Sequence, residues 1–145
     1  EGQDIIIPDG KKENPRPAVA QNSGIAAREY ESFSSGKTLN GPAGKGHSFP
    51  YGYCTWYVAQ KRYVPWSGNA GTWLYKAKAM GYATSKTPTV GSIMVSSESW
   101  WGHVALVEKV SGNMITISEM NYKGFAKKSY RTLDYRSRQI KGFIK

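Results

Sequence analysis

The spacing of apolar residues changes at Pro88, and this change limits the folds that the chain can adopt. Before Pro88, residues 54–63 and 73–80 run without glycine or proline, which is typical of helices. After Pro88, polar and apolar residues alternate, which predicts strands at 91–95, 103–108, 114–121, 130–133 and 140–144. Helices followed by a meander of strands predict an α+β fold, with the helices packed on one face of an antiparallel sheet.

The composition changes near residue 45. Residues 1–45 are rich in proline, glycine and serine and contain few large apolar side chains, so we expect a linker or docking arm. A short amphipathic helix is predicted within it at 23–33. Residues 46–145 are enough for one folded domain, and the whole chain of 145 residues is too short for two good cores.

The formal net charge of +10 belongs entirely to residues 46–145, which hold 14 basic and four acidic residues. Such a balance favours an anionic partner: nucleic acid, a membrane surface or an acidic polymer such as a bacterial wall. A merely soluble basic surface explains the charge equally well. No apolar run approaches the roughly 20 residues of a membrane-spanning helix, so we expect no span. The chain opens without a signal segment, so we expect either a cytoplasmic protein or a trimmed form.

Cys54 is the only cysteine, which excludes an internal disulfide and a zinc site built from several cysteines. It stands where the first helix is predicted to start, and a helix N-terminus favours an anion such as a thiolate. The residue is therefore either a nucleophile or a buried structural cysteine, and its position alone favours neither.

His103 opens a predicted strand, and the chain has only one other histidine, His47. Glu119 and Asn121 are two residues apart on the next predicted strand, so they should share a face. Either could accept the Nδ1 proton of His103 and turn its other nitrogen toward Cys54. A cysteine at a helix start, a histidine on a strand and a polar acceptor on the following strand form the arrangement of a papain-type nucleophile.

Four short motifs in order resemble the CHAP family of cysteine- and histidine-dependent amidohydrolases and peptidases, which cut bacterial peptidoglycan. They are Tyr-Gly-Tyr-Cys-Thr-Trp-Tyr at 51–57, Pro-x-x-Gly-x-Ile at 88–93, Gly-His-Val-Ala-x-Val at 102–107 and Glu-x-Asn-Tyr at 119–122. The resemblance covers about residues 46–145, and it implies a papain-like catalytic domain there.

The resemblance assigns roles to individual residues. It implies that Cys54 is the nucleophile, His103 the general base, Glu119 the residue that orients the histidine and Asn121 a further polar residue of the site. Tyr53 stands where the family often has glutamine, which removes one side-chain donor to an oxyanion. Some members bind calcium through acidic residues ahead of the cysteine; residues 47–53 contain none, so we expect no metal and no cofactor.

Aromatic side chains close to these motifs are candidates for substrate contact. Trp100 and Trp101 directly precede Gly102 and His103, and neighbours in an extended chain point opposite ways, so one of them could pack inward while the other lines a groove. Tyr53 directly precedes the cysteine. We expect these three to contact substrate, with core packing as the alternative.

These features together predict a secreted or wall-associated peptidoglycan hydrolase, either an N-acetylmuramoyl-L-alanine amidase or a peptide endopeptidase. We expect a monomer whose partners are peptidoglycan and anionic wall polymers. A wall-binding module that has lost catalysis is the alternative. Nucleic-acid binding is not expected, because most aromatic residues cluster around the site motifs rather than among the basic residues.

Overall fold

A computed structural model describes residues 36–145, which belong to the compact unit Ser34–Lys145. The predicted helix at 23–33 lies outside the described residues. The helical elements are α2 (Cys54–Lys61), the 3-10 turn η1 (Ala70–Thr72) and α3 (Trp73–Ala79). The strands are β3 (Thr84–Ser85), β4 (Ile93–Ser96), β5 (His103–Ser111), β6 (Met114–Met120), β7 (Lys128–Asp134) and β8 (Ile140–Ile144).

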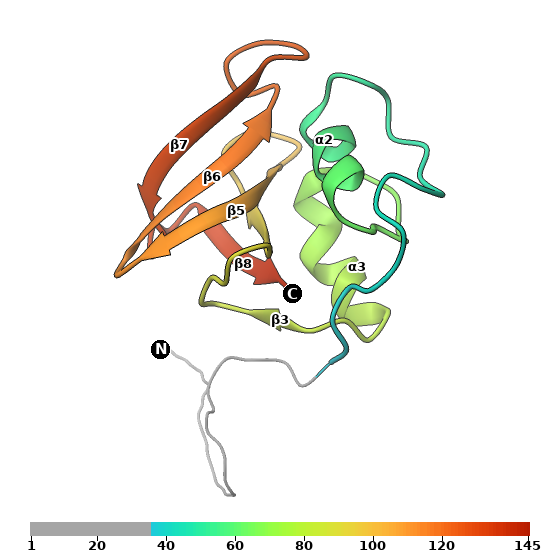
Figure 1. Ribbon diagram of the computed structural model, residues 1–145, viewed down its shortest axis with the longest axis horizontal. Coiled ribbons are helices and arrows are strands. Elements are labelled where there is room, and N and C mark those ends of the chain that lie inside the picture. Colours follow the sequence, from blue (N-terminus) through green and yellow to red (C-terminus); the bar gives the residue numbers. More distant parts are fainter. Residues whose placement is uncertain (1–35) are drawn as a thin grey trace, which may run out of the picture. The chain divides into compact units, whose positions relative to one another are not determined.

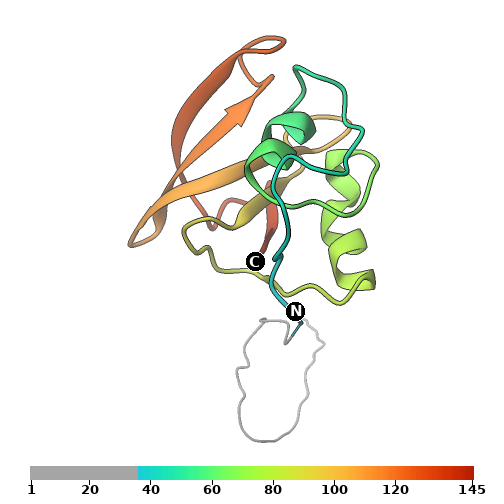
Figure 2. The same ribbon diagram turned by 45° about the vertical axis from the view of Figure 1, so that its right-hand side comes forward.

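The six strands form one antiparallel sheet in the order β3-β8-β4-β5-β6-β7. Both helices lie on the same side of this sheet, as Figures 1 and 2 show from two directions. The predicted α+β fold is therefore confirmed. The sequence pattern did not reveal β3, because its two residues are too few to show alternation.

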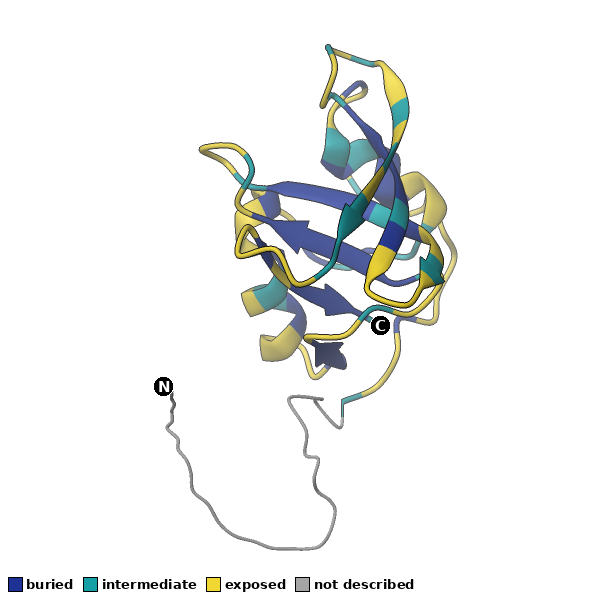
Figure 3. Ribbon diagram, turned by 90° about the vertical axis from the view of Figure 1, so that its left-hand side faces the viewer, coloured by how far each residue is buried: buried dark blue, intermediate teal, exposed yellow. Residues whose placement is uncertain are grey.

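The sheet is buried on both faces. On β4, Ile93 and Val95 pack into a cluster with Val58, Trp73 and other helical residues, whereas Met94 points into a second cluster. The second cluster joins β5, β6 and β8 on the other face. Figure 3 shows the resulting band of buried strands between exposed loops. Successive side chains along these strands therefore point into two different apolar layers, rather than alternating between an apolar face and a solvent-exposed face.

The described part of the predicted arm contacts the domain. Leu39 is buried in the helix-side core, and the Lys37 amide donates to the carbonyl of Gly81. Arg62, just after α2, donates to the backbone carbonyls of Gly91, Lys145 and Leu39. One guanidinium therefore ties three distant segments together. The role of the arm as a linker or docking segment stays a prediction.

Candidate active site

The thiol stands at the first residue of α2, as the sequence indicated. Cys54 is half-buried, and Tyr53 is the N-cap. Gly52 precedes them with a φ of +100°, and a Cβ there would lie 2.3 Å from the ring of Phe125. Only glycine accepts both the left-handed backbone and the ring, so Gly52 fixes how the chain enters the helix.

The histidine is placed by a second glycine of the same kind. Gly102 has a φ of +84°, and a Cβ there would meet the Gly71 backbone nitrogen at 2.3 Å. The Gly71 amide also donates to the Trp101 carbonyl at 2.8 Å, so the loop before β5 is docked against η1. His103 follows as the first residue of β5 and is 5% exposed.

Cys54 and His103 both line a cleft of about 880 Å³, and Cys54 lies close enough to influence the pKa of the imidazole. Burial by itself would lower the pKa of His103. Hydrogen bonds and negative charge from Cys54 and Glu119 outweigh burial and raise that pKa to about 9. The pair is therefore arranged to hold a proton on the imidazole beside the sulfur.

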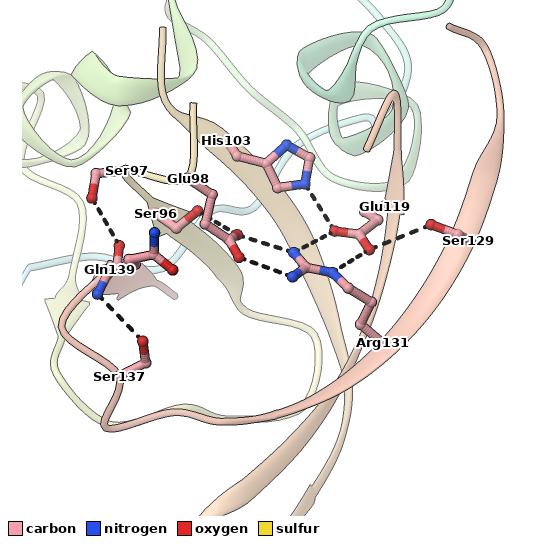
Figure 4. A network of polar contacts seen from close by, with 9 residues as sticks. All are labelled: Ser96, Ser97, Glu98, His103, Glu119, Ser129, Arg131, Ser137 and Gln139. Carbon is pink, nitrogen blue, oxygen red and sulfur yellow. Dashed lines mark hydrogen bonds and ion pairs between the residues drawn. The ribbon is translucent and has the colours of Figure 1, made fainter. Parts of the chain in front are cut away.

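Glu119 accepts a hydrogen bond of 2.8 Å from His103, but the donor is Nε2 and not Nδ1, as the sequence analysis expected. Figure 4 shows the other ring nitrogen of His103, Nδ1, pointing away from Glu119. Glu119 has no exposed surface. Burial would raise its pKa, but hydrogen bonds from His103 and Arg131 lower it below the ordinary value.

Asn121 lies beyond the end of β6, which finishes at Met120. Its φ of +65° breaks the strand alternation that the sequence analysis extended to it. The residue lines the cleft together with Tyr53 and Trp101. Trp100 is 89% exposed and does not line the cleft. The substrate contacts expected of Tyr53, Trp100 and Trp101 stay predictions, and the geometry favours Tyr53 and Trp101.

Three side chains of the site were not found by reading the sequence. Tyr122 lines the cleft, its ring 5.8 Å from that of His103. The guanidinium of Arg131 contacts Glu119 and Glu98, and its Cζ lies 3.7 Å from the centre of the Tyr122 ring. Tyr122 belongs to a motif already noted. Arg131 and Glu98 carry no such signal, because they are 33 positions apart and meet only through the sheet.

Residues 36–145 contain no group of three or more histidine, cysteine or acidic side chains that could hold a metal ion.

Within the same range, none of the helices has the length and apolar character needed to cross a membrane.

Comparisons with known proteins agree with this geometry. A family model described as "CHAP domain" matches residues 44–121, more than half of the chain. The probable autolysin LDP of Staphylococcus aureus is 43% identical over 99 residues, which are 63% of this chain and 35% of that protein. The staphylococcal secretory antigen SsaA of Staphylococcus aureus is 40% identical over 95 residues, 61% of this chain and 37% of that protein.

A crystal structure of an N-acetylmuramoyl-L-alanine amidase from Staphylococcus aureus has a similar fold. The TM-score is 0.58 at 32% identity, and the match covers 66% of this chain and 30% of that one. The chain thus spans little more than a third of the length of the curated relatives it matches.

Proposed function

Because this chain belongs to the CHAP family, we propose that it is a cysteine hydrolase that cleaves an amide bond of bacterial peptidoglycan. The observation that carries the proposal is that Cys54 and His103 line the same open cleft, with His103 hydrogen-bonded to the buried Glu119 and its pKa raised by both Cys54 and Glu119. A thiol buried for structural reasons needs neither a titratable partner nor access to solvent. The autolysin and amidase names of the relatives point to the same substrate.

In the proposed mechanism, the Cys54 thiolate attacks the amide carbonyl and forms a C–S bond. In this mechanism the backbone N–H of Cys54, the first residue of α2, donates to the developing oxyanion. As the C–N bond breaks, His103 gives its proton to the leaving amine. The imidazole then takes a proton from water as the resulting hydroxide attacks the thioester. The C–S bond breaks, the acid leaves, and the thiolate and the protonated imidazole are restored.

The raised pKa of His103 sets the alkaline limit of this cycle. A protonated imidazole is needed for the leaving amine, and His103 holds its proton up to about pH 9. We therefore expect the rate to hold below that pH and to fall as the pH rises through it. A rate that decays already between pH 6 and 7 would mean that the ring behaves as an ordinary histidine.

The finer points of the proposal concern the substrate and the place of action. Both an N-acetylmuramoyl-L-alanine amidase and a peptide endopeptidase cleave an amide, and the residues described here serve either. The +10 charge suits an anionic wall. The autolysin and secretory antigen among the relatives support action outside the cell, in the medium or at the wall. We propose that the chain acts there as a monomer.

The test is digestion of purified peptidoglycan followed by mass spectrometry of the soluble products. We expect the chain to release fragments with one new amine terminus and one new carboxylate. Cys54→Ala should lower the rate by on the order of 10⁴-fold or more while leaving thermal unfolding unchanged. A folded Cys54→Ala variant that keeps the rate would refute the assignment. Binding to the wall without release of products by the unaltered chain would instead indicate a module that has lost catalysis.

A further inference from the structure

A chain of charged side chains runs from His103 through Glu119 and Arg131 to Glu98, which itself lines the cleft. Arg131, on β7, donates from Nε to Glu119 Oε2 at 2.7 Å and from one terminal nitrogen to Glu119 Oε1 at 2.9 Å. Its terminal nitrogens also donate to the two oxygens of Glu98 at 2.9 and 3.0 Å. Figure 4 shows the guanidinium lying between the two carboxylates, with His103 on the far side of Glu119.

We propose that Arg131 and Glu98 are positioning residues for catalysis: Arg131 fixes the carboxylate plane of Glu119, and Glu98 supplies negative charge that keeps His103 protonated. The proposal rests on the function proposed above. It concerns residues that the motifs do not contain, and Arg131 lies outside the residues that the family model matches.

Arg131 positions Glu119 because its guanidinium donates to both oxygens of that carboxylate. A carboxylate held at both oxygens cannot rotate, so its Oε1 stays aligned on His103 Nε2. Ser129, beside Glu119 on the neighbouring strand, adds only a contact of 3.4 Å. The guanidinium is itself held, because it stacks on the Tyr122 ring at 3.7 Å. A lysine here could supply the positive charge, but its single nitrogen lacks the planar group of donors with which arginine bonds both carboxylates.

The electrostatic half follows from counting charges. Glu98 and Glu119 carry two negative charges against the single positive charge of Arg131, so the group keeps one net negative charge beside His103. Without Glu98, Arg131 and Glu119 would cancel and favour the imidazolium less. The influence is mutual, since the charge of His103 contributes to lowering the pKa of Glu98, against the opposing effect of burial. Ser96 and Arg131 hold Glu98 by hydrogen bonds in this ionised form.

The titratable and charged groups around His103 come from every element packed near it: Cys54 on α2, Glu119 on β6, Tyr122 after β6, Arg131 on β7 and Glu98 in the 97–102 loop. Of these groups, Glu98 is the charged one that contacts neither His103 nor its partners Cys54 and Glu119; it reaches Glu119 through Arg131. It also belongs to the loop that carries Trp101, so the same contact fixes that wall of the cleft.

Two substitutions separate geometry from charge in the full chain. Arg131→Lys keeps the charge and removes the fork, so we expect kcat to fall about tenfold with the alkaline limb of the pH–rate profile in place. Glu98→Gln keeps the shape and removes the charge, so we expect that limb to move to lower pH by about half to one pH unit, with a smaller change in kcat at pH 7. Arg136→Lys is the matched control and should change neither.

A second readout needs no activity. In a Cys54→Ala background, NMR titration of the two histidines reports the His103 ring directly, with His47 as internal reference. Adding Glu98→Gln should lower the pH at which His103 titrates and leave His47 unchanged. The inference is overturned if His103 titrates at the same pH with and without Glu98, or if folded Arg131→Lys retains the full kcat. Failure of the proposed function looks different, because the unaltered chain would then release no product.

Discussion

Two arginines on or near β7 make the same kind of contact with very different surroundings. Arg131, within the strand, forks onto Glu119 and Glu98, and its side chain is 18% exposed. Arg136, two residues beyond the strand end, forks onto Asp134, and the two side chains are 61% and 41% exposed. Both pairs are bidentate. The contact of Arg131 is mostly shielded from water, whereas that of Arg136 is open to it, so we expect the first to influence a neighbouring group more strongly.

Both arginines lower the pKa of the carboxylate that they contact, but the two shifts have different consequences. Arg136 lowers the pKa of Asp134 to about 2, yet this pair is open to solvent and salt. Arg131 lowers the pKa of Glu119 against the opposing effect of burial, and Glu119 in turn contacts His103. The buried pair therefore transmits its charge to the proposed reaction, whereas the exposed pair does not.

The largest effect that this comparison predicts comes from removing the charge at the centre of the buried group. Glu119→Gln should lower kcat about 10²-fold, because the His103 ring loses the negative charge that favours its protonated form, and the amide nitrogen cannot accept from Arg131. The alkaline limb should also move to lower pH. Steady-state rates on solubilised peptidoglycan between pH 5 and 10 measure both. Unchanged rates in a folded variant would break the link between the buried group and catalysis.

A smaller effect is expected from the backbone that carries His103. In Gly102→Ala the new Cβ would clash with the backbone of Gly71, and alanine disfavours the positive φ. The first residues of β5, which include His103, must then shift. We therefore expect kcat to fall about tenfold and the melting temperature to drop. Gly112→Ala is the control, because Gly112 also has a positive φ (59°) but nothing lies within 4 Å of a Cβ there.

If Gly112→Ala lowers the rate as much as Gly102→Ala does, the cost is one of general backbone strain. The loss of rate in Gly102→Ala would then carry no information about how His103 is positioned. Thermal unfolding of the two variants separates these cases, since both should lose stability and only Gly102→Ala should lose rate beyond that.

The smallest effect belongs to the exposed pair. Asp134→Asn should leave kcat, the pH–rate profile and thermal unfolding within experimental error of the unaltered chain, at low and at high salt. A change in the alkaline limb would mean that charge at this end of β7 reaches His103. Burial would then not be what distinguishes Arg131 from Arg136.

The sequence was informative where function is carried by local signals. Cys54 at a helix start and His103 at a strand start follow from hydrophobic spacing, and Gly52 and Gly102 appear in the motifs because their backbone needs no side chain. The nitrogen that Glu119 binds was predicted wrongly, because strand register alone does not say which side of a ring faces its neighbour. Arg131 and Glu98 could not be found, since their contact is created by the sheet.

The proposed mechanism requires an accessible Cys54 thiol that works with His103, and alkylation of the native chain tests this requirement. The chain has one cysteine, so iodoacetamide modifies a single known thiol. We expect one label per folded chain and loss of hydrolysis in proportion to labelling, with slower labelling in His103→Ala. A thiol that is modified only after unfolding, or a fully labelled chain that still releases wall fragments, would contradict the account.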